Sequence, residues 1–429
     1  MSVLTNSRFR VITGKGLLGP AAALFVSANI ANAANLLFNM IFARLMGPAA
    51  FADLTLLLTL KLGVLSFLGA VQFAFAEHTA KTNTARASKL KAHALSWRSL
   101  KISVPIMFVV MALANFISAS LNFSSPLALG LLALAIPFFL PMVIYRGLTQ
   151  GLIDVPKIIL SIQAEWIIRL VGSVILWQIG LGLPGIAIAV GLSIVAGFVF
   201  SCDKQDAELH RKALKSKDVF VAKALGVTAL PYLILQVAQV LVLDSDILVA
   251  KAMFSAETAG LVAGLLLIQR VFFFAFLSCS TILQPYIAKQ KDGEKSPKEL
   301  FTLLMAIGAI TAFALLIIVP NAQVFVSLML GSEYEALSSI VWISALTGAV
   351  FIVSHLCAIY QIAKGKKLAA QMVLGFGVLQ LISLSTINHF FPDMGLQSYF
   401  SLKLAIQVMC AICLLCVVVG AQKRPVLEG

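Results

Sequence analysis

Residues 16–48 read GLLGPAAALFVSANIANAANLLFNMIFARLMGP, an apolar stretch long enough to cross a bilayer as one helix. The stretch nevertheless carries asparagines at intervals of three or four residues, which places them on one side of a helix: Asn29, Asn32, Asn35 and Asn39. Because unpaired amides are costly in hydrocarbon, we expect this side to face other helices or a wet cavity. The closing phrase, Arg44 to Pro48, predicts a turn at a membrane surface.

The composition indicates an integral membrane protein. Of the 429 residues, 60% are hydrophobic and only 12% are charged, which excludes an ordinary soluble domain. The net charge of +14 does not predict a nucleic-acid partner, because the basic residues lie in short segments between apolar runs, where they set topology.

The apolar runs predict an all-α integral membrane fold with twelve transmembrane helices. No loop between them is long enough for a separate soluble domain. The expected spans are residues 17–42, 52–76, 101–122, 127–149, 157–179, 183–202, 226–249, 259–285, 300–320, 337–362, 369–390 and 396–420.

The distribution of basic residues predicts the orientation of these helices. With twelve spans, 26 of the 32 lysines and arginines fall on the side of the termini. The loops on the other side contain only Arg44 and Lys251. Because lysine and arginine are concentrated on the cytoplasmic side, we expect a multi-pass protein with both termini cytoplasmic.

An internal repeat divides the chain into two halves. NLLFNMIFARLM at residues 35–46 aligns with VLDSDILVAKAM at residues 242–253, and after one insertion Lys61 falls within a residue of Arg270. We expect an N-terminal six-helix lobe (residues 1–202), a cytoplasmic linker (203–225) and a C-terminal six-helix lobe (226–429). An even number of helices in each half makes the two repeats parallel.

Four basic residues lie inside the apolar runs: Lys61, Arg169, Arg270 and Lys403. Each costs about 2.5–3.5 kcal/mol at the centre of a helix, which calls for a functional or structural reason. Lys61 and Arg270 lie near the membrane midplane at equivalent positions of the two halves. They are interpreted as a cationic lining for an anionic substrate; the alternative is that each pairs with a carboxylate or extends to the surface.

The other two basic residues have local explanations. Glu165 precedes Arg169 by four residues, which favours an ion pair within one helix. Lys403 lies near the start of its helix and could reach the membrane surface.

The acidic residues of the spans are candidates for ion coupling. Glu165, Asp244 and Asp246 could bind a coupling Na⁺ or H⁺, or the two aspartates could balance Lys251 and Arg270. Asp53 is expected to serve the outer surface. We expect no other cofactor and no catalytic or metal site, since there is no Walker A pattern and the histidines lack metal-ligand spacing.

The phrase ARLMGPAAFA at residues 43–52 resembles the turn after the first helix of Wzx-type polysaccharide flippases, in the superfamily of MATE exporters and lipid II flippases. Ala52 and Met46 stand where glycine and leucine are usual. The resemblance implies two six-helix lobes around a central cavity that opens alternately to each side of a bacterial inner membrane. It also implies a cargo, an undecaprenyl-pyrophosphate-linked oligosaccharide of O-antigen or exopolysaccharide.

The residues agree with what the resemblance implies. A pyrophosphate needs cations at membrane depth, which Lys61 and Arg270 would supply with Arg169 and Lys403. A sugar chain needs hydrogen-bonding groups, which the asparagine side would supply through residues including Asn29, Asn32 and Asn39. The partners expected are the lipid-linked oligosaccharide, membrane lipids, and polysaccharide assembly proteins such as a polymerase or chain-length regulator.

Three other functions fit the same apolar pattern. A MATE-type drug antiporter for organic cations would favour an acidic cavity, whereas the charges at midplane lean basic. A membrane polysaccharide polymerase or ligase usually has a large outer loop with arginine or histidine, and residues 321–336 contain neither. A lipid scramblase is the third alternative. We expect a transporter rather than an enzyme.

Overall fold

The computed structural model describes residues 18–82, 84–202, 230–289, 298–391 and 395–420, and all its regular elements are helices. The first half contains α1 (Leu18–Lys81), α2 (Ala85–Ala112), α3 (Ala114–Ser120), α4 (Pro126–Ala133), α5 (Ile136–Gly151), α6 (Val155–Gln178) and α7 (Gly182–Ser201). The second half contains α10 (Leu230–Asp244), α11 (Asp246–Met253), α12 (Ala256–Lys289), α13 (Lys298–Ile318), α14 (Ala322–Met329), the 3₁₀ helix η1 (Ser332–Leu337), α15 (Val341–Ala363), α16 (Leu368–Phe390) and α17 (Leu396–Gly420).

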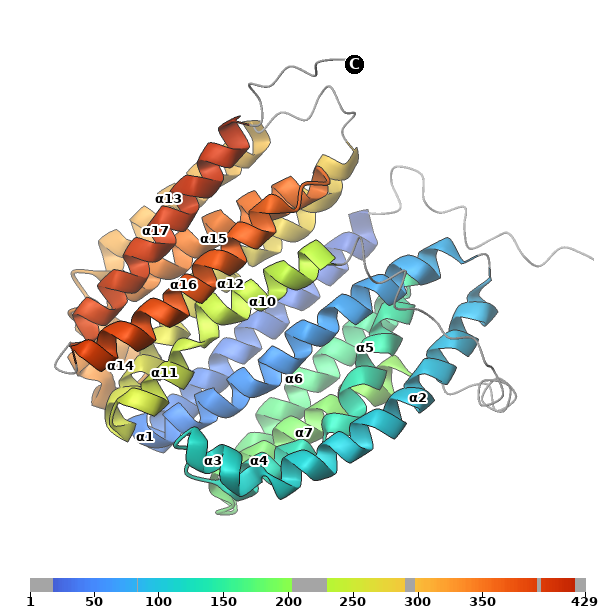
Figure 1. Ribbon diagram of the computed structural model, residues 1–429, viewed down its shortest axis with the longest axis horizontal. Coiled ribbons are helices and arrows are strands. Elements are labelled where there is room, and N and C mark those ends of the chain that lie inside the picture. Colours follow the sequence, from blue (N-terminus) through green and yellow to red (C-terminus); the bar gives the residue numbers. More distant parts are fainter. Residues whose placement is uncertain (1–17, 83, 203–229, 290–297, 392–394, 421–429) are drawn as a thin grey trace, which may run out of the picture.

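Helix α1 consists of two limbs joined at Gly47. This residue has φ 70°, in the region that glycine adopts more readily than other residues, and Pro48 follows it. Figure 1 shows the two limbs running side by side in opposite directions. They correspond to the first two expected spans.

The span count agrees with the twelve-helix prediction. Among the described residues, ten helices are long and apolar enough to cross a membrane, or eleven if α4 and α5, bent by 44°, form one span. That count treats α1 as one helix, although its two limbs form separate spans. The all-α membrane fold is therefore confirmed.

Several boundaries differ from the predicted ones. The expected loop at residues 77–100 is mostly helical, because α1 extends to Lys81 and α2 begins at Ala85 after an N-cap in which Thr84 Oγ1 accepts from Ala87 N at 3.4 Å. The seventh span breaks at Ser245, between α10 and α11.

The two halves of the chain lie on opposite sides of the molecule (Figure 1). Helix α1 forms the main contact across them, packing against α10, α11 and α12. The largest core cluster extends across this contact, with Phe38, Phe42 and Phe51 from α1 and Leu265 and Ile268 from α12. The expected linker, residues 203–225, lies outside the described residues, as does the start of the second lobe.

The halves interlock at the end of the molecule that contains Gly47, here called the Gly47 end. Lys251 Nζ and Asp53 Oδ1 form a buried ion pair at 2.7 Å across the two halves, so Asp53 does not serve the surface as expected. Asn122 donates to the Lys251 carbonyl at 2.8 Å. Arg44 donates to the carbonyl groups of Ser327 and Leu328 at the end of α14.

Candidate functional site

A cavity of about 210 Å³ lies between the first limb of α1 and α12. Three asparagines of α1 and one arginine of α12 provide its polar lining: Asn29, Asn32, Asn35 and Arg270. Apolar side chains, including Leu36, Leu267 and Phe274, complete it. Asn35 is twelve residues from Gly47, roughly 18 Å along a helix, so the cavity is deep in the molecule. The asparagine side and one of the two expected midplane cations therefore meet.

Arg270 is shared between this cavity and an ion pair. Its side chain lines the cavity, while one terminal nitrogen pairs with the carboxylate of Asp244. The same guanidinium approaches Thr59 Oγ1 of the second limb of α1, at 3.4 Å. A guanidinium is always charged and presents several donors in a fixed plane, so Arg270 can hold more than one acceptor.

Lys61 lies outside the cavity lining. Its Nζ is 3.0 Å from Glu165 Oε1, and Glu165 Oε2 in turn binds Arg146 at 2.9 Å. Lys61 is on the second limb of α1, which turns it toward α6 instead of α12. Lys61 and Arg270, which were expected to be equivalent, thus have different surroundings, and the described cavity is lined by Arg270 without Lys61.

Arg169 does not pair with Glu165 as the helical spacing predicted. It donates to Asn35 Oδ1 at 3.0 Å and its guanidinium carbon lies 5.4 Å from the centre of the Phe38 ring. Glu165 is already held by Lys61 and Arg146, which explains why the local pair does not form. By binding the amide oxygen of Asn35, Arg169 directs that side chain's nitrogen donors away from itself.

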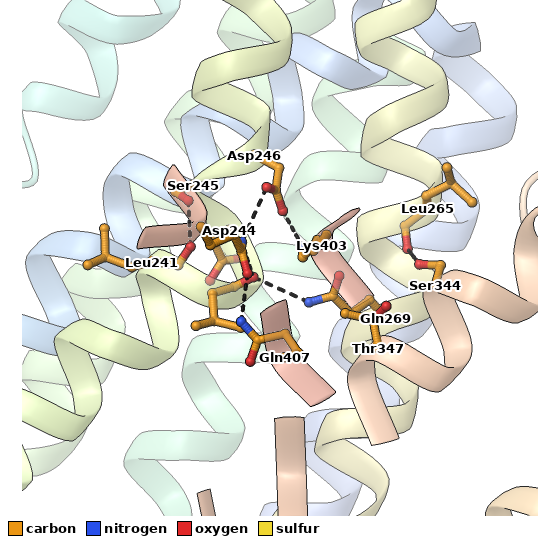
Figure 2. A network of polar contacts seen from close by, with 12 residues as sticks. Leu241, Asp244, Ser245, Asp246, Leu265, Gln269, Ser344, Thr347, Lys403 and Gln407 are labelled. Atoms are coloured by element: carbon orange, nitrogen blue, oxygen red, sulfur yellow. Dashed lines mark hydrogen bonds and ion pairs between the residues drawn. The ribbon is translucent and has the colours of Figure 1, made fainter. Parts of the chain in front are cut away.

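The aspartates of α10 and α11 are held by basic residues of the same half. Asp246 pairs with Lys403 and accepts from Gln380 Nε2 at 3.3 Å and Tyr399 OH at 3.4 Å. Lys403 is fully buried, so it does not extend to the membrane surface. Figure 2 shows Asp244 and Asp246 close together at the break near Ser245, with Lys403 beside them. Lys251, a partner considered for these aspartates, binds Asp53 instead.

The remaining asparagines have mixed roles. Asn39 is buried and donates to the Asn35 carbonyl of its own helix at 2.7 Å, so it does not line the cavity. Asn29 lines the cavity and donates to the Phe25 carbonyl at 2.8 Å. Arg146 was missed because its place near the end of a span suggested a loop position; the available signal was an arginine inside the apolar run of residues 127–149.

Comparison with known proteins identifies the fold. No family model and no curated protein matches the sequence. A multidrug resistance MATE family transporter of the MOP superfamily in an inward-facing conformation is similar with a TM-score of 0.74 at 15% identity, covering 91% of this chain and 95% of that one. An outward-facing structure of a multidrug resistance MATE family transporter gives 0.62 at 16% identity, covering 95% and 96%.

A third similar structure is a MOP superfamily transporter from Pyrococcus furiosus, described as having a binding pocket of reverse polarity that suggests a different function. Its TM-score is 0.63 at 15% identity, and the match covers 95% of this chain and 96% of that one. The chain therefore has the fold of MOP-superfamily transporters. The similar structures named here are transporters.

Proposed function

We propose that this protein is a membrane transporter that carries an anionic cargo through the cavity between its halves. The observation that supports the proposal is the sign of the buried charge around the cavity. Arg270 lines it directly, and Arg169 lies behind Asn35 on the opposite wall. Because a binding site selects its partner by complementary charge, basic walls favour an anion over a cation.

The charge excess is concentrated in the first half of the chain. Lys61, Arg146 and Arg169 lie near a single carboxylate, Glu165, which forms ion pairs with the first two. In the second half, Asp244 and Asp246 match Arg270 and Lys403. The cluster around Glu165 is therefore positive overall, and in a low-dielectric setting that charge attracts an anion in the neighbouring cavity.

The cargo that fits best is a lipid-linked oligosaccharide with a pyrophosphate group, carried from the cytoplasmic to the outer leaflet. The cavity, at about 210 Å³, is smaller than most pockets for drug-sized ligands, so it suits a compact charged head group. Asparagines beside Arg270 add hydrogen-bonding groups for phosphate or sugar. The reverse polarity described for the Pyrococcus furiosus transporter supports variation of cargo charge on this fold.

Transport by alternating access accounts for the closed Gly47 end. The distribution of basic residues places this end outside the cell. The ion pair of Asp53 with Lys251 would then close the external side, while the cavity lies toward the cytoplasmic side. The higher similarity to the inward-facing transporter, 0.74 against 0.62, agrees with this state.

The second candidate is a MATE-type antiporter of organic cations. Fold similarity favours it, because the neighbours include multidrug resistance MATE transporters. Such a cargo would need a carboxylate facing the cavity, whereas the described lining contains none.

Reconstituted protein separates the two candidates. Proteoliposomes carrying a fluorescent polyprenyl-pyrophosphate-linked sugar would be compared with vesicles loaded with ethidium, a cationic dye. We expect the lipid-linked sugar to change leaflets with the wild type and at least about tenfold more slowly with Arg270→Gln, a loss of ~1.4 kcal/mol. Exposed Arg86→Gln is the matched control. Ethidium transport without movement of the pyrophosphate lipid would favour the cation antiporter.

A further inference from the structure

We infer that an anion entering the cavity replaces Asp244 as the partner of Arg270, and that Asp244 then takes up one proton. Binding of cargo would thus be linked to protonation of this carboxylate. The inference rests on the proposed anionic cargo and adds the ion whose binding is linked to that of the cargo, H⁺, together with the residue that carries it.

Arg270 belongs to the cavity and to the ion pair with Asp244 at the same time. It lines the cavity beside Asn32 and Asn35 while pairing with Asp244. Its Nε is buried and has no hydrogen-bond partner among the described residues. An anion in the cavity can therefore approach a guanidinium whose donors are only partly used, and it would compete with Asp244 for them.

The surroundings of Asp244 leave no replacement for Arg270. Asp244 is 1% exposed, so water does not compensate its charge. The nearest other cation, Lys403 of α17, is already bound to Asp246, which also accepts from Gln380 and Tyr399. The polar groups around the two aspartates come from α11, α12, α16 and α17: Asp246, Gln269, Arg270, Gln380, Tyr399, Lys403 and Gln407. Figure 2 shows Asp246, Gln269, Lys403 and Gln407 among them.

The balance of charges in the cluster explains why binding of an anion would be accompanied by binding of a proton. The cluster contains two cations, Arg270 and Lys403, and two carboxylates, Asp244 and Asp246. If an anion takes Arg270, a buried carboxylate loses its partner, and such groups are neutralised by protonation. A hydronium ion or a buffer acid transfers one proton to a carboxylate oxygen of Asp244; the donor's bond to that proton breaks as the new O–H bond forms, and the donor is left as water or the buffer base. A metal cation would instead have to compete with both basic residues for these carboxylates.

Reciprocity makes the link measurable. If binding of the anion promotes protonation of Asp244, protonation promotes binding of the anion by the same factor. Anion affinity should therefore fall as the pH rises, by about tenfold per pH unit where one proton is taken up. Replacing Asp244 by asparagine removes both the competitor and the proton site, so the affinity should become higher and independent of pH in that range.

The test is calorimetry on the purified full-length protein in lipid nanodiscs. The probe is farnesyl pyrophosphate at mildly alkaline pH, where its own phosphates are fully ionised. Titrations in two buffers of different ionisation enthalpy give the number of protons bound with the probe. We expect about one for the wild type and close to zero for Asp244→Asn. Asp154→Asn, the same change at the surface pair with Lys157, should behave as the wild type.

Asp244→Glu is a second variant, which keeps a carboxylate and should keep the proton uptake. If the wild type binds the probe but takes up no more protons than Asp244→Asn, the exchange of Asp244 for the anion as the partner of Arg270 is overturned. The anion site itself would still stand. Absence of binding to the wild type, or unchanged binding to Arg270→Gln, would overturn the proposed function and the inference with it.

Discussion

At the residue scale, Glu165 and Asp246 carry the same charge but differ in the number of their ion-pair partners, so they differ in how much they depend on a single lysine. Glu165 forms ion pairs with both Lys61 and Arg146, so it keeps one cation if the other is lost. Asp246 has a single ion-pair partner in the described structure, Lys403. Removing one member of a buried ion pair leaves an uncompensated charge. The resulting loss of stability is larger than the net stabilisation that the intact pair provides.

Substitution of Lys403 by methionine should therefore destabilise the protein more than substitution of Lys61. We expect Lys403→Met to cost about 3–5 kcal/mol and Lys61→Met clearly less. Adding Asp246→Asn to Lys403→Met should recover much of the loss, because the unpaired charge disappears. Thermal unfolding of the purified variants in one detergent gives the comparison. Equal losses for the two lysines would show that Arg146 does not support Glu165.

Gly260 tests how closely the halves approach at the Gly47 end. A Cβ at this position would overlap the backbone carbonyl of Pro48, which cannot rotate away as a side chain can. We expect Gly260→Ala to force the Gly47 turn of α1 and the start of α12 apart and to increase labelling of a cysteine placed at the buried position of Ala52. Gly308→Ala is the matched control, since nothing lies within 4 Å of its Cβ position. An unchanged labelling rate would mean that this end is already open in the membrane.

At the scale of the elements, the helices could be predicted and their partners could not. Apolar length and the alternation of basic loops depend on local sequence, so the spans could be predicted, whereas the repeat remains a prediction. The ion pairs join distant helices: Lys61 and Glu165 are 104 residues apart, and Asp246 and Lys403 are 157 apart. The ion pair that the helical spacing predicted between Glu165 and Arg169 does not form, because Glu165 pairs with residues more distant in the sequence.

The pair between Asp53 on α1 and Lys251 on α11 should hold the Gly47 end closed. Asp53→Lys would place two cations together in a buried site and shift the protein toward opening at this end. The exchange Asp53→Lys with Lys251→Asp should restore closure. Distances between spin labels on the ends of α4 and α14 would report the change. A double variant as open as the single one would show that the pair plays no part in closure.

At the scale of the whole molecule, the two halves differ in charge. The first half has a cation excess around Glu165, and the second has matched pairs. The cavity lies where the two meet. In the proposed function, movement of one half against the other would expose this charge to each side of the membrane in turn.

The orientation that the basic residues predict can be tested directly. In a variant without its native cysteines, a cysteine at Val324, at the Gly47 end, should react in intact cells with a maleimide that cannot cross membranes. A cysteine at Lys366, at the opposite end, should react only after permeabilisation. Both positions are exposed in the described structure, so accessibility depends on the side of the membrane. The reverse pattern would invert the proposed direction of transport.

The most direct test is the structure of the protein in nanodiscs with a polyprenyl pyrophosphate, determined by electron cryo-microscopy. The account predicts phosphate density within hydrogen-bonding distance of Arg270, between Asn32 and Asn35, with Asp244 separated from the guanidinium. Phosphate density elsewhere, with Arg270 still bound to Asp244, would contradict it.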